Sequence, residues 1–218
     1  MVERVHHTTF APRRAGETVE LCHSYSAGAG RDGILVCPPS PLLGGDLDNN
    51  VVRALAGAAA AAGWPVARFN YRGVGASLPA GPLPRYEYWR AVLGRGDLGP
   101  AIADGREALA RSRRLFRPVA IWGYSLGAAV ALALACADAP EAALALVGPP
   151  LGAHDMGALR TRSHPALVVF AAADELEPVP ADLARFAPHT VRVLAGADHF
   201  FRGREAELAA LVLSEMPQ

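Results

Sequence analysis

Three polar residues of this chain have the types and the order that nucleophilic acyl chemistry requires, namely Ser125, Asp174 and His199. A serine hydroxyl is a weak nucleophile near neutral pH, so it needs a base, and histidine suits because its pKa lies close by. The histidine in turn needs a carboxylate that holds its tautomer and stabilises the imidazolium. The three residues therefore predict a catalytic triad, provided that the fold brings them together.

The sequence around Ser125 is Gly123-Tyr124-Ser125-Leu126-Gly127, a G-x-S-x-G motif. The apolar run 118–122 before it predicts a buried strand, and the apolar run 128–137 after it predicts a buried helix. A serine at such a strand–turn–helix junction sits in a strained turn that requires small neighbours, and its hydroxyl is exposed. The N–H of Leu126 then lies at a helix N-terminus, where it can stabilise an oxyanion. The motif alone is weak, because a chain with 22 glycines can match three fixed positions by chance.

The rest of the sequence predicts strands that alternate with helices, and therefore an α/β fold with a mainly parallel central sheet covered on both faces. The first two strands should form an antiparallel edge, and Asp46 should cap the first helix. Ligands bind at the carboxyl ends of the strands in such sheets, and all three triad candidates follow a predicted strand end. The predicted strands are 2–10, 17–25, 33–37, 64–70, 118–122, 142–147, 165–171 and 190–195, and the helices are 47–62, 97–114, 128–137, 181–186 and 205–214.

Other residues compete for the acid and base roles. Asp155 follows the 142–147 strand, where some folds place the acid, but its neighbour His154 could be the base only if the residue order were broken. Asp198 adjoins His199, and adjacent side chains seldom face each other. Glu175 and Glu177 follow Asp174, which is preferred because it comes first after its strand. The list of rivals is therefore Asp155, Asp198, Glu175 and Glu177 as acids and His154 as base.

A second oxyanion donor is expected from the loop after the 33–37 strand. Three prolines in that loop, Pro38, Pro39 and Pro41, have no N–H to offer. Ser40 is the one residue among them that has an N–H, and Leu42 is the fallback donor. The sequence therefore predicts an oxyanion hole formed by Ser40 and Leu126.

The segment 78–96 is the least regular part of the chain, with three prolines followed by an aromatic cluster. It could be a surface loop held by its aromatic residues, or a small lid over a pocket, and the lid is preferred because the segment follows a strand end. Candidates for lining the substrate pocket are Leu42, Tyr124, Tyr86, Tyr88, Trp89 and Phe200.

Composition limits the other possibilities. The 218 residues predict one domain spanning 1–218, and the zero formal net charge gives no reason to expect nucleic acid or a membrane as partner. The first residues lack the apolar segment of a signal peptide, so a cytoplasmic protein is expected. Cys22, Cys37 and Cys136 lie in apolar segments without metal-ligand spacing, which predicts reduced core cysteines. We expect no metal, no cofactor, and a monomer or homodimer.

Five stretches together resemble a known family: 38–45 with 48–52, 69–77, 123–127, 174–178 and 196–201. From about residue 33 onward the chain resembles the small, capless bacterial α/β-hydrolases related to dienelactone hydrolases and serine-aminopeptidase-like esterases. The resemblance implies the α/β-hydrolase fold with a small cap or none. It also implies Ser125 as nucleophile, Asp174 as acid, His199 as base, and Ser40 and Leu126 as oxyanion donors.

Two departures from this family lie near the expected pocket. Relatives often have histidines where this chain has Pro38 and Ser40, and the 78–96 segment is longer than usual. The leading hypothesis is a serine hydrolase that cleaves an ester or thioester of a small apolar acyl group. The second hypothesis is a biosynthetic enzyme that performs acyl transfer, lactone formation or non-hydrolytic cyclisation in the same site. The third, a non-catalytic binding protein, is disfavoured by the complete set of triad residues.

Overall fold

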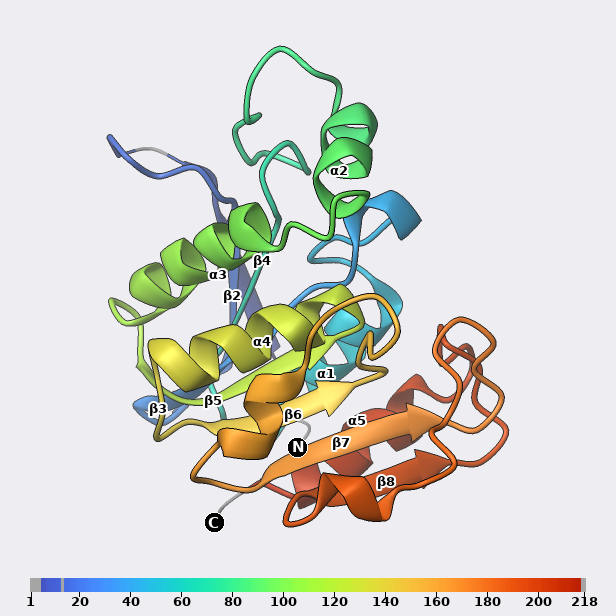
Figure 1. Ribbon diagram of the computed structural model, residues 1–218. Coiled ribbons are helices and arrows are strands. Elements are labelled where there is room, and N and C mark those ends of the chain that lie inside the picture. Colours follow the sequence, from blue (N-terminus) through green and yellow to red (C-terminus); the bar gives the residue numbers. More distant parts are fainter. Residues whose placement is uncertain (1–4, 13, 217–218) are drawn as a thin grey trace.

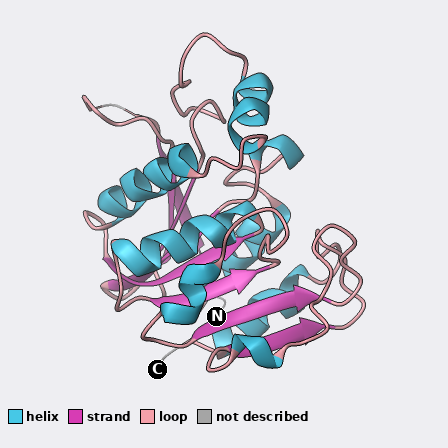
Figure 2. Ribbon diagram, viewed as in Figure 1, coloured by secondary structure: helices cyan, strands magenta, loops and turns pink. Residues whose placement is uncertain are grey.

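The computed structural model describes residues 5–12 and 14–216. Its centre is an eight-stranded sheet with the strand order β1-β2-β4-β3-β5-β6-β7-β8 (Figures 1 and 2). β1 and β2 pair antiparallel, β2 also pairs antiparallel with β4, and the strands from β4 through β8 are parallel. The strands are β1 Val5–Phe10, β2 Leu21–Ser26, β3 Asp32–Cys37, β4 Val66–Phe69, β5 Arg117–Tyr124, β6 Ala143–Val147, β7 Ala166–Ala171 and β8 Thr190–Leu194.

Alternate residues of the central strands enter two separate hydrophobic cores, one on each face of the sheet. In β5, for example, Ile121 belongs to the core under α3 and α4, whereas Ala120 and Trp122 belong to the core under α1 and α5. Figure 1 shows α3 and α4 in front of the sheet and α1 and α5 behind it. The prediction of an α/β fold with helices on both faces is confirmed. The α-helices are α1 Asn50–Ala61, α2 Arg85–Leu93, α3 Gly99–Ser112, α4 Leu126–Ala137 and α5 Glu205–Ser214.

The first helix begins later than its sequence suggests. Asn49 caps α1, because its side chain accepts hydrogen bonds from the N–H groups of Val51 and Val52. Asp46 instead accepts a hydrogen bond from the N–H of Asp48 within the preceding turn, at 2.9 Å. The prediction of a helix over 47–62 capped by Asp46 is therefore wrong at its start.

Two further boundaries differ because side chains bind the backbone. The predicted strand 17–25 corresponds to β2, which begins only at Leu21. The N–H groups of Thr18 and Val19 donate to the Glu107 carboxylate at 2.7 and 3.0 Å, and not to a neighbouring strand. The helix predicted over 181–186 is only the short 3-10 helix η3, Ala184–Phe186, whose Ala184 N–H donates to the Asp182 side chain. Part of the predicted 2–10 strand lies outside the described residues.

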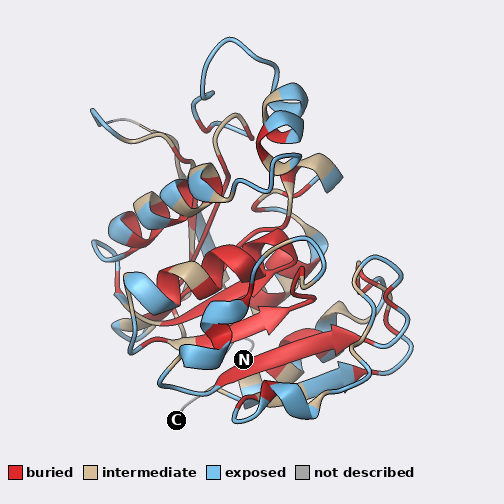
Figure 3. Cartoon of the chain, in the orientation of Figure 1, coloured by how far each residue is buried: buried red, intermediate tan, exposed pale blue. Residues whose placement is uncertain are grey.

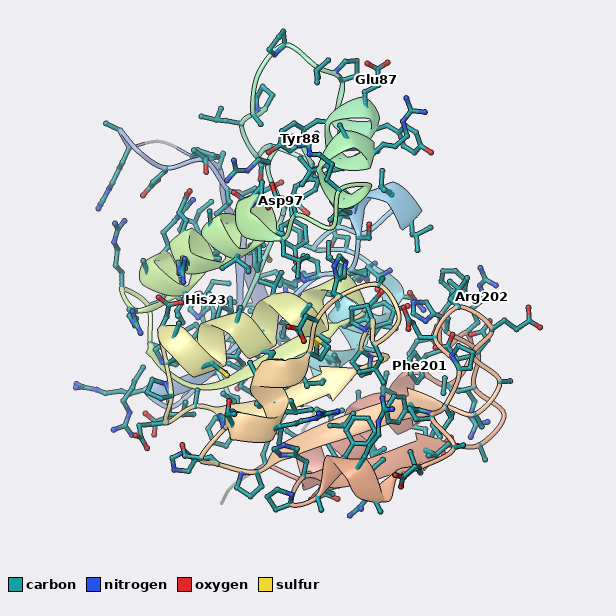
Figure 4. All side chains as sticks on the ribbon, viewed as in Figure 1. His23, Glu87, Tyr88, Asp97, Phe201 and Arg202 are labelled. Carbon is teal, nitrogen blue, oxygen red and sulfur yellow. The ribbon has the colours of Figure 1, made fainter. Side chains whose placement is uncertain are left out.

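The segment 78–96 contains a helix that the sequence pattern did not predict. Residues 85–93 form α2, which packs against the 3-10 helix η1, Pro41–Leu43, in the loop after β3. The fully buried Trp89 anchors α2, because its indole N–H donates to the carbonyl of Arg72 at 3.1 Å and its ring contacts Tyr71 edge-on. The rest of α2 is largely exposed, and Glu87 points away from the sheet (Figures 3 and 4). The segment is thus a small helical excursion, not a separate cap.

The cysteines only partly follow expectation. Cys22 and Cys37 are buried and unpaired, but Cys136 is exposed near the end of α4, so its assignment to the core is wrong. None of the helices in the described part of the chain is long and apolar enough to cross a membrane.

Candidate active site

The G-x-S-x-G motif forms a sharp turn between β5 and α4. Ser125 follows the last residue of β5 and precedes the first residue of α4, with φ 53° and ψ −122°. A positive φ is strained for a residue with a side chain, so neighbouring groups must hold the turn. The N–H of Ser125 donates to the carbonyl of Val147, at the end of the adjacent strand β6, at 2.8 Å. The nucleophile candidate is therefore fixed at the carboxyl edge of the sheet.

The two glycines of the motif are required by close backbone approach. A Cβ atom on Gly123 would lie 2.1 Å from the carbonyl oxygen of Gly127, across the turn. A Cβ atom on Gly127 would lie 2.2 Å from the carbonyl oxygen of Cys37 and 2.6 Å from that of Pro38. All three distances are far below van der Waals contact. The start of α4 consequently packs directly on the beginning of the loop after β3.

The structure brings Ser125, His199 and Asp174 together at the ends of β5, β8 and β7. Nε2 of His199 lies 3.3 Å from Oγ of Ser125, and Nδ1 lies 2.8 Å from Oδ2 of Asp174. All three residues are buried, with relative exposures of 8 % for Ser125, 4 % for His199 and 6 % for Asp174. Their contacts form one continuous chain from hydroxyl to carboxylate.

The contacts of Asp174 fix which imidazole nitrogen carries the hydrogen. An ionised carboxylate only accepts hydrogen bonds, so Nδ1 of His199 must donate and Nε2 is left as an acceptor facing Ser125. The other oxygen of Asp174, Oδ1, accepts hydrogen bonds from the N–H groups of Leu176 and Glu177 at 2.9 and 2.8 Å. Asp174 is thereby oriented by its own turn, and the imidazole has the tautomer that a general base requires.

The two candidate oxyanion donors are Leu126, the residue after Ser125, and Ser40, in the loop whose start packs on Gly127. Among described residues, no hydrogen-bond acceptor is found for the backbone N–H of Ser40 or of Leu126. The fallback donor Leu42 is less available, because its N–H donates to the Ser40 hydroxyl at 3.3 Å. The packing of Gly127 against Cys37 and Pro38 holds the two loops together. The arrangement leaves Ser40 and Leu126 as the donors that an oxyanion could use.

The proposed pocket residues do not form one group. Phe200 is half-buried and meets the His199 ring edge-on at 5.5 Å, and Leu42 is half-buried in η1 next to Ser40. Tyr88 lines a cavity of about 340 Å³ beneath the 79–85 loop, together with Arg72 and Arg85 and without any triad residue. Tyr86 is 57 % exposed on α2.

Two of the pocket predictions need correction, because Trp89 and Tyr124 are 0 % and 1 % exposed. Trp89 serves as the anchor of α2. Tyr124 points into the core under α1 and α5, as strand alternation requires for a neighbour of Trp122 in β5. Neither side chain offers a surface to a substrate.

The rival acids and base occupy other positions. Oδ1 of Asp155 accepts a hydrogen bond from Gly157 N–H, and His154 lines a surface cavity between η2, Gly157–Thr161, and η3. Asp198 forms an exposed ion pair with Arg202 at 3.6 Å, and Glu175 is exposed. None of these groups contacts the imidazole of His199 in the described structure.

Glu177, the remaining rival, lies near the site but faces another loop. Its Oε2 accepts a hydrogen bond from the N–H of Gly152 at 3.2 Å. The pKa of Glu177 is raised mainly by burial and to a smaller extent by the nearby Asp174 carboxylate. Glu177 therefore ties the loop after β6 to the turn that carries Asp174.

Sequence reasoning missed three supporting contacts. Tyr71, fully buried, donates its hydroxyl hydrogen to the carbonyl of Pro38 at 3.0 Å and so fixes the oxyanion loop. Arg72 forms a bidentate ion pair with the buried Asp104 of α3, and Asp104 also accepts the backbone N–H of Arg72. Tyr124 donates its hydroxyl hydrogen to the carbonyl of His199 at 2.9 Å. The alternation of β5 could have placed Tyr124 in the core, but its partner could not be found from spacing.

No group of three His, Cys, Asp or Glu side chains arranged to hold a metal ion is found within residues 5–12 and 14–216. The predictions of no metal and no cofactor stay predictions.

The sheet order, the helices on both faces and the serine at a strand–helix turn define the α/β-hydrolase fold, without a separate cap. No protein-family model matches the sequence, and no match is found among curated proteins. Solved structures do match. An α/β serine hydrolase homologue from Coxiella burnetii has a TM-score of 0.78 and 27 % identity, over 96 % of this chain and 97 % of that one.

Two further structures show the same fold at lower identity. An α/β serine hydrolase without a lid from Xanthomonas campestris has a TM-score of 0.74 and 23 % identity, over 95 % of this chain and 92 % of that one. A cold-adapted esterase from an Arctic intertidal metagenomic library has a TM-score of 0.66 and 18 % identity, over 95 % of this chain and 94 % of that one. The resemblance to capless α/β-hydrolases stated from the sequence motifs is thus confirmed.

Proposed function

We propose that this protein is a serine hydrolase that cleaves an ester, or a thioester, of a small apolar acyl group. The observation that carries the proposal is the continuous chain from Ser125 Oγ through both nitrogens of His199 to Asp174, at 3.3 and 2.8 Å. Its place at the carboxyl edge of an α/β-hydrolase sheet supports the same chemistry. The matching hydrolases and esterase agree with this class of reaction.

In the first half of the reaction, Ser125 Oγ attacks the carbonyl carbon of the substrate while His199 Nε2 takes the hydroxyl proton. The carbonyl oxygen becomes an oxyanion, which accepts hydrogen bonds from the N–H groups of Ser40 and Leu126. Asp174 remains ionised and stabilises the imidazolium through Nδ1–H. The tetrahedral intermediate then collapses, and the leaving alcohol or thiol takes the proton from Nε2.

In the second half, water attacks the acyl-enzyme and His199 again acts as base. The serine–acyl bond breaks, the acid is released, and the proton returns to Ser125 Oγ. Two apolar side chains lie next to site residues, Phe200 against the imidazole and Leu42 two positions after Ser40, and these support an apolar acyl group.

The direct test is the variant Ser125→Ala with p-nitrophenyl esters of two to eight acyl carbons and the corresponding thioesters. We expect turnover to fall by about 10⁴-fold or more, and labelling by a fluorophosphonate to disappear. A Ser125→Ala variant that kept the wild-type rate would refute the mechanism. If the wild type took up the fluorophosphonate but released no acid from any ester or thioester, the hydrolytic reaction would be refuted.

The chain offers a matched control at its surface. Ser163 Oγ lies 3.2 Å from Nδ1 of the exposed His164, whose Nε2 lies 3.6 Å from Glu141. This second Ser–His–carboxylate set lies outside the strained turn and beside no packed oxyanion loop. Ser163→Ala should therefore leave turnover and labelling unchanged. The control shows that the losses in Ser125→Ala come from the candidate site and not from removing a serine hydroxyl elsewhere.

A further inference from the structure

Tyr124, the residue before Ser125, makes a direct contact between the nucleophile turn and the loop that carries His199. Its buried hydroxyl donates to the carbonyl oxygen of His199 at 2.9 Å, although the two residues are 75 positions apart. Burial raises the pKa of the Tyr124 phenol, so the group keeps its hydrogen and acts as a donor. The backbone of the base is thus bonded to the residue next to the nucleophile.

The loop that carries His199 has a strained backbone two residues after the histidine, at Phe201. Phe201, between β8 and α5 (Figure 4), has φ 51°, a region that an aromatic residue seldom occupies. Its ring is fully buried and meets the Tyr124 ring edge-on at 6.1 Å. The burial of Phe201 against Tyr124 therefore helps to maintain a backbone conformation that is unfavourable by itself.

The imidazole itself has little freedom once its backbone is fixed. The Tyr124 ring lies 5.7 Å from the His199 ring at 36°, and Phe200 lies edge-on at 89°. The ring position is thus set by contacts on several sides and by the His199 carbonyl that Tyr124 holds.

We propose that Tyr124 is a positioning residue of the active site, whose hydroxyl holds the His199 backbone so that Nε2 stays within reach of Ser125 Oγ. The second residue of the G-x-S-x-G motif then has a function in this chain beyond filling the core. This inference rests on the proposed hydrolase function, which it deepens.

The test compares Tyr124→Phe with the wild type, because phenylalanine retains the ring and removes only the hydroxyl. A small displacement of a catalytic group is costly in rate, so we expect kcat to fall about tenfold or more while KM stays within about twofold. The rate of fluorophosphonate labelling should fall by a similar factor, since it depends on the same activation of Ser125.

The control is Ser112→Ala, which also removes a buried hydroxyl bonded to a backbone carbonyl, that of Ala108 at 2.8 Å in α3. It should leave kcat and the labelling rate unchanged. A Tyr124→Phe enzyme with kcat within twofold of the wild type would overturn the inference, because a purely structural hydroxyl predicts that result.

A readout that needs no substrate separates this inference from the proposed function. The Nδ1 proton of His199, shared with Asp174 at 2.8 Å, should give a downfield imidazole resonance in the proton NMR spectrum of the wild type. In Tyr124→Phe we expect this resonance to shift or broaden, and in Ser112→Ala to stay unchanged. An unchanged resonance in Tyr124→Phe overturns the inference even if the wild type hydrolyses esters, and a shifted one supports it even if the wild type hydrolyses none.

Discussion

Replacing Gly127 with alanine tests the idea that the start of α4 and the oxyanion loop must pack without any side chain between them. Gly127 lies in α4, and the added Cβ atom would lie 2.2 Å from the carbonyl oxygen of Cys37. Ordinary contact needs about 3.5 Å, so the loop after β3 must move by about 1 Å. We expect that movement to displace the N–H of Ser40, which follows Pro38 in the same loop, and so to misalign it as an oxyanion donor.

The stability effect of Gly127→Ala should be moderate, because the added methyl group meets backbone atoms and not the end of a flexible side chain. Forcing a methyl group into packed surroundings costs about 1–3 kcal/mol, but alanine in place of glycine in a helix stabilises it by about 1 kcal/mol. The net loss of unfolding free energy is therefore about 0–2 kcal/mol. The loss of one aligned oxyanion donor, by contrast, lowers kcat by about 10²–10³-fold. That loss of kcat corresponds to about 2.7–4 kcal/mol of transition-state stabilisation, which is more than the expected loss of unfolding free energy.

The assay is kcat on a p-nitrophenyl ester, measured together with urea unfolding of the same protein. The matched control is Gly57→Ala in α1, where an added Cβ atom meets no atom within 4 Å. Gly57→Ala should stabilise the fold by about 0.5–1 kcal/mol and leave kcat unchanged. Wild-type kcat in Gly127→Ala would refute the reasoning, and so would an equal loss of kcat in Gly57→Ala.

Two further predictions concern stability. Asp104→Ala leaves Arg72 without its carboxylate and should lower the free energy of unfolding in urea by about 3 kcal/mol. Asp138→Ala breaks the more exposed pair with Arg106 and should lower it by less than about 1 kcal/mol. Equal losses in the two variants would contradict this prediction. Burial lowers the pKa of His23 in β2 (Figure 4), where its Nε2 has no partner, so below about pH 6.5 the unfolded chain binds more protons than the folded one and stability is lost as pH falls. His23→Phe should reduce the drop in Tm between pH 7.5 and pH 5.5, and an unchanged drop would contradict the assignment.

The fold and the meeting of Ser125, Asp174 and His199 could be predicted from sequence because both depend on local patterns. Apolar runs mark the strands, and parallel strands end at one edge, so residues just after strand ends come together. Hydrogen bonds from side chains to the backbone set the boundaries that differed. The Asn49 side chain, for example, outcompetes Asp46 as the cap of α1.

The remaining errors concern residues whose environment depends on distant partners. Trp89 and Tyr124 are candidates for the pocket lining when only the sequence is considered, yet both are buried in the core. The prolines before residue 85 gave no indication of α2, whose anchor Trp89 is buried against Tyr71 and Arg72. The contacts of Tyr71 with Pro38 and of Tyr124 with His199 join segments that no local pattern connects.

The order of the strands along the chain also determines when the residues of the candidate site become available during translation. β5 to β8 add to the sheet in the order in which they are synthesised, so the turn with Ser125 can form on β6 before His199 has been made. His199 is synthesised 74 residues after Ser125. At about 5–20 residues per second, that interval lasts roughly 4–15 s. Under the proposed mechanism, a nascent chain carries its serine without a base throughout this time, so it cannot cleave esters until His199, which follows the last strand, has been translated.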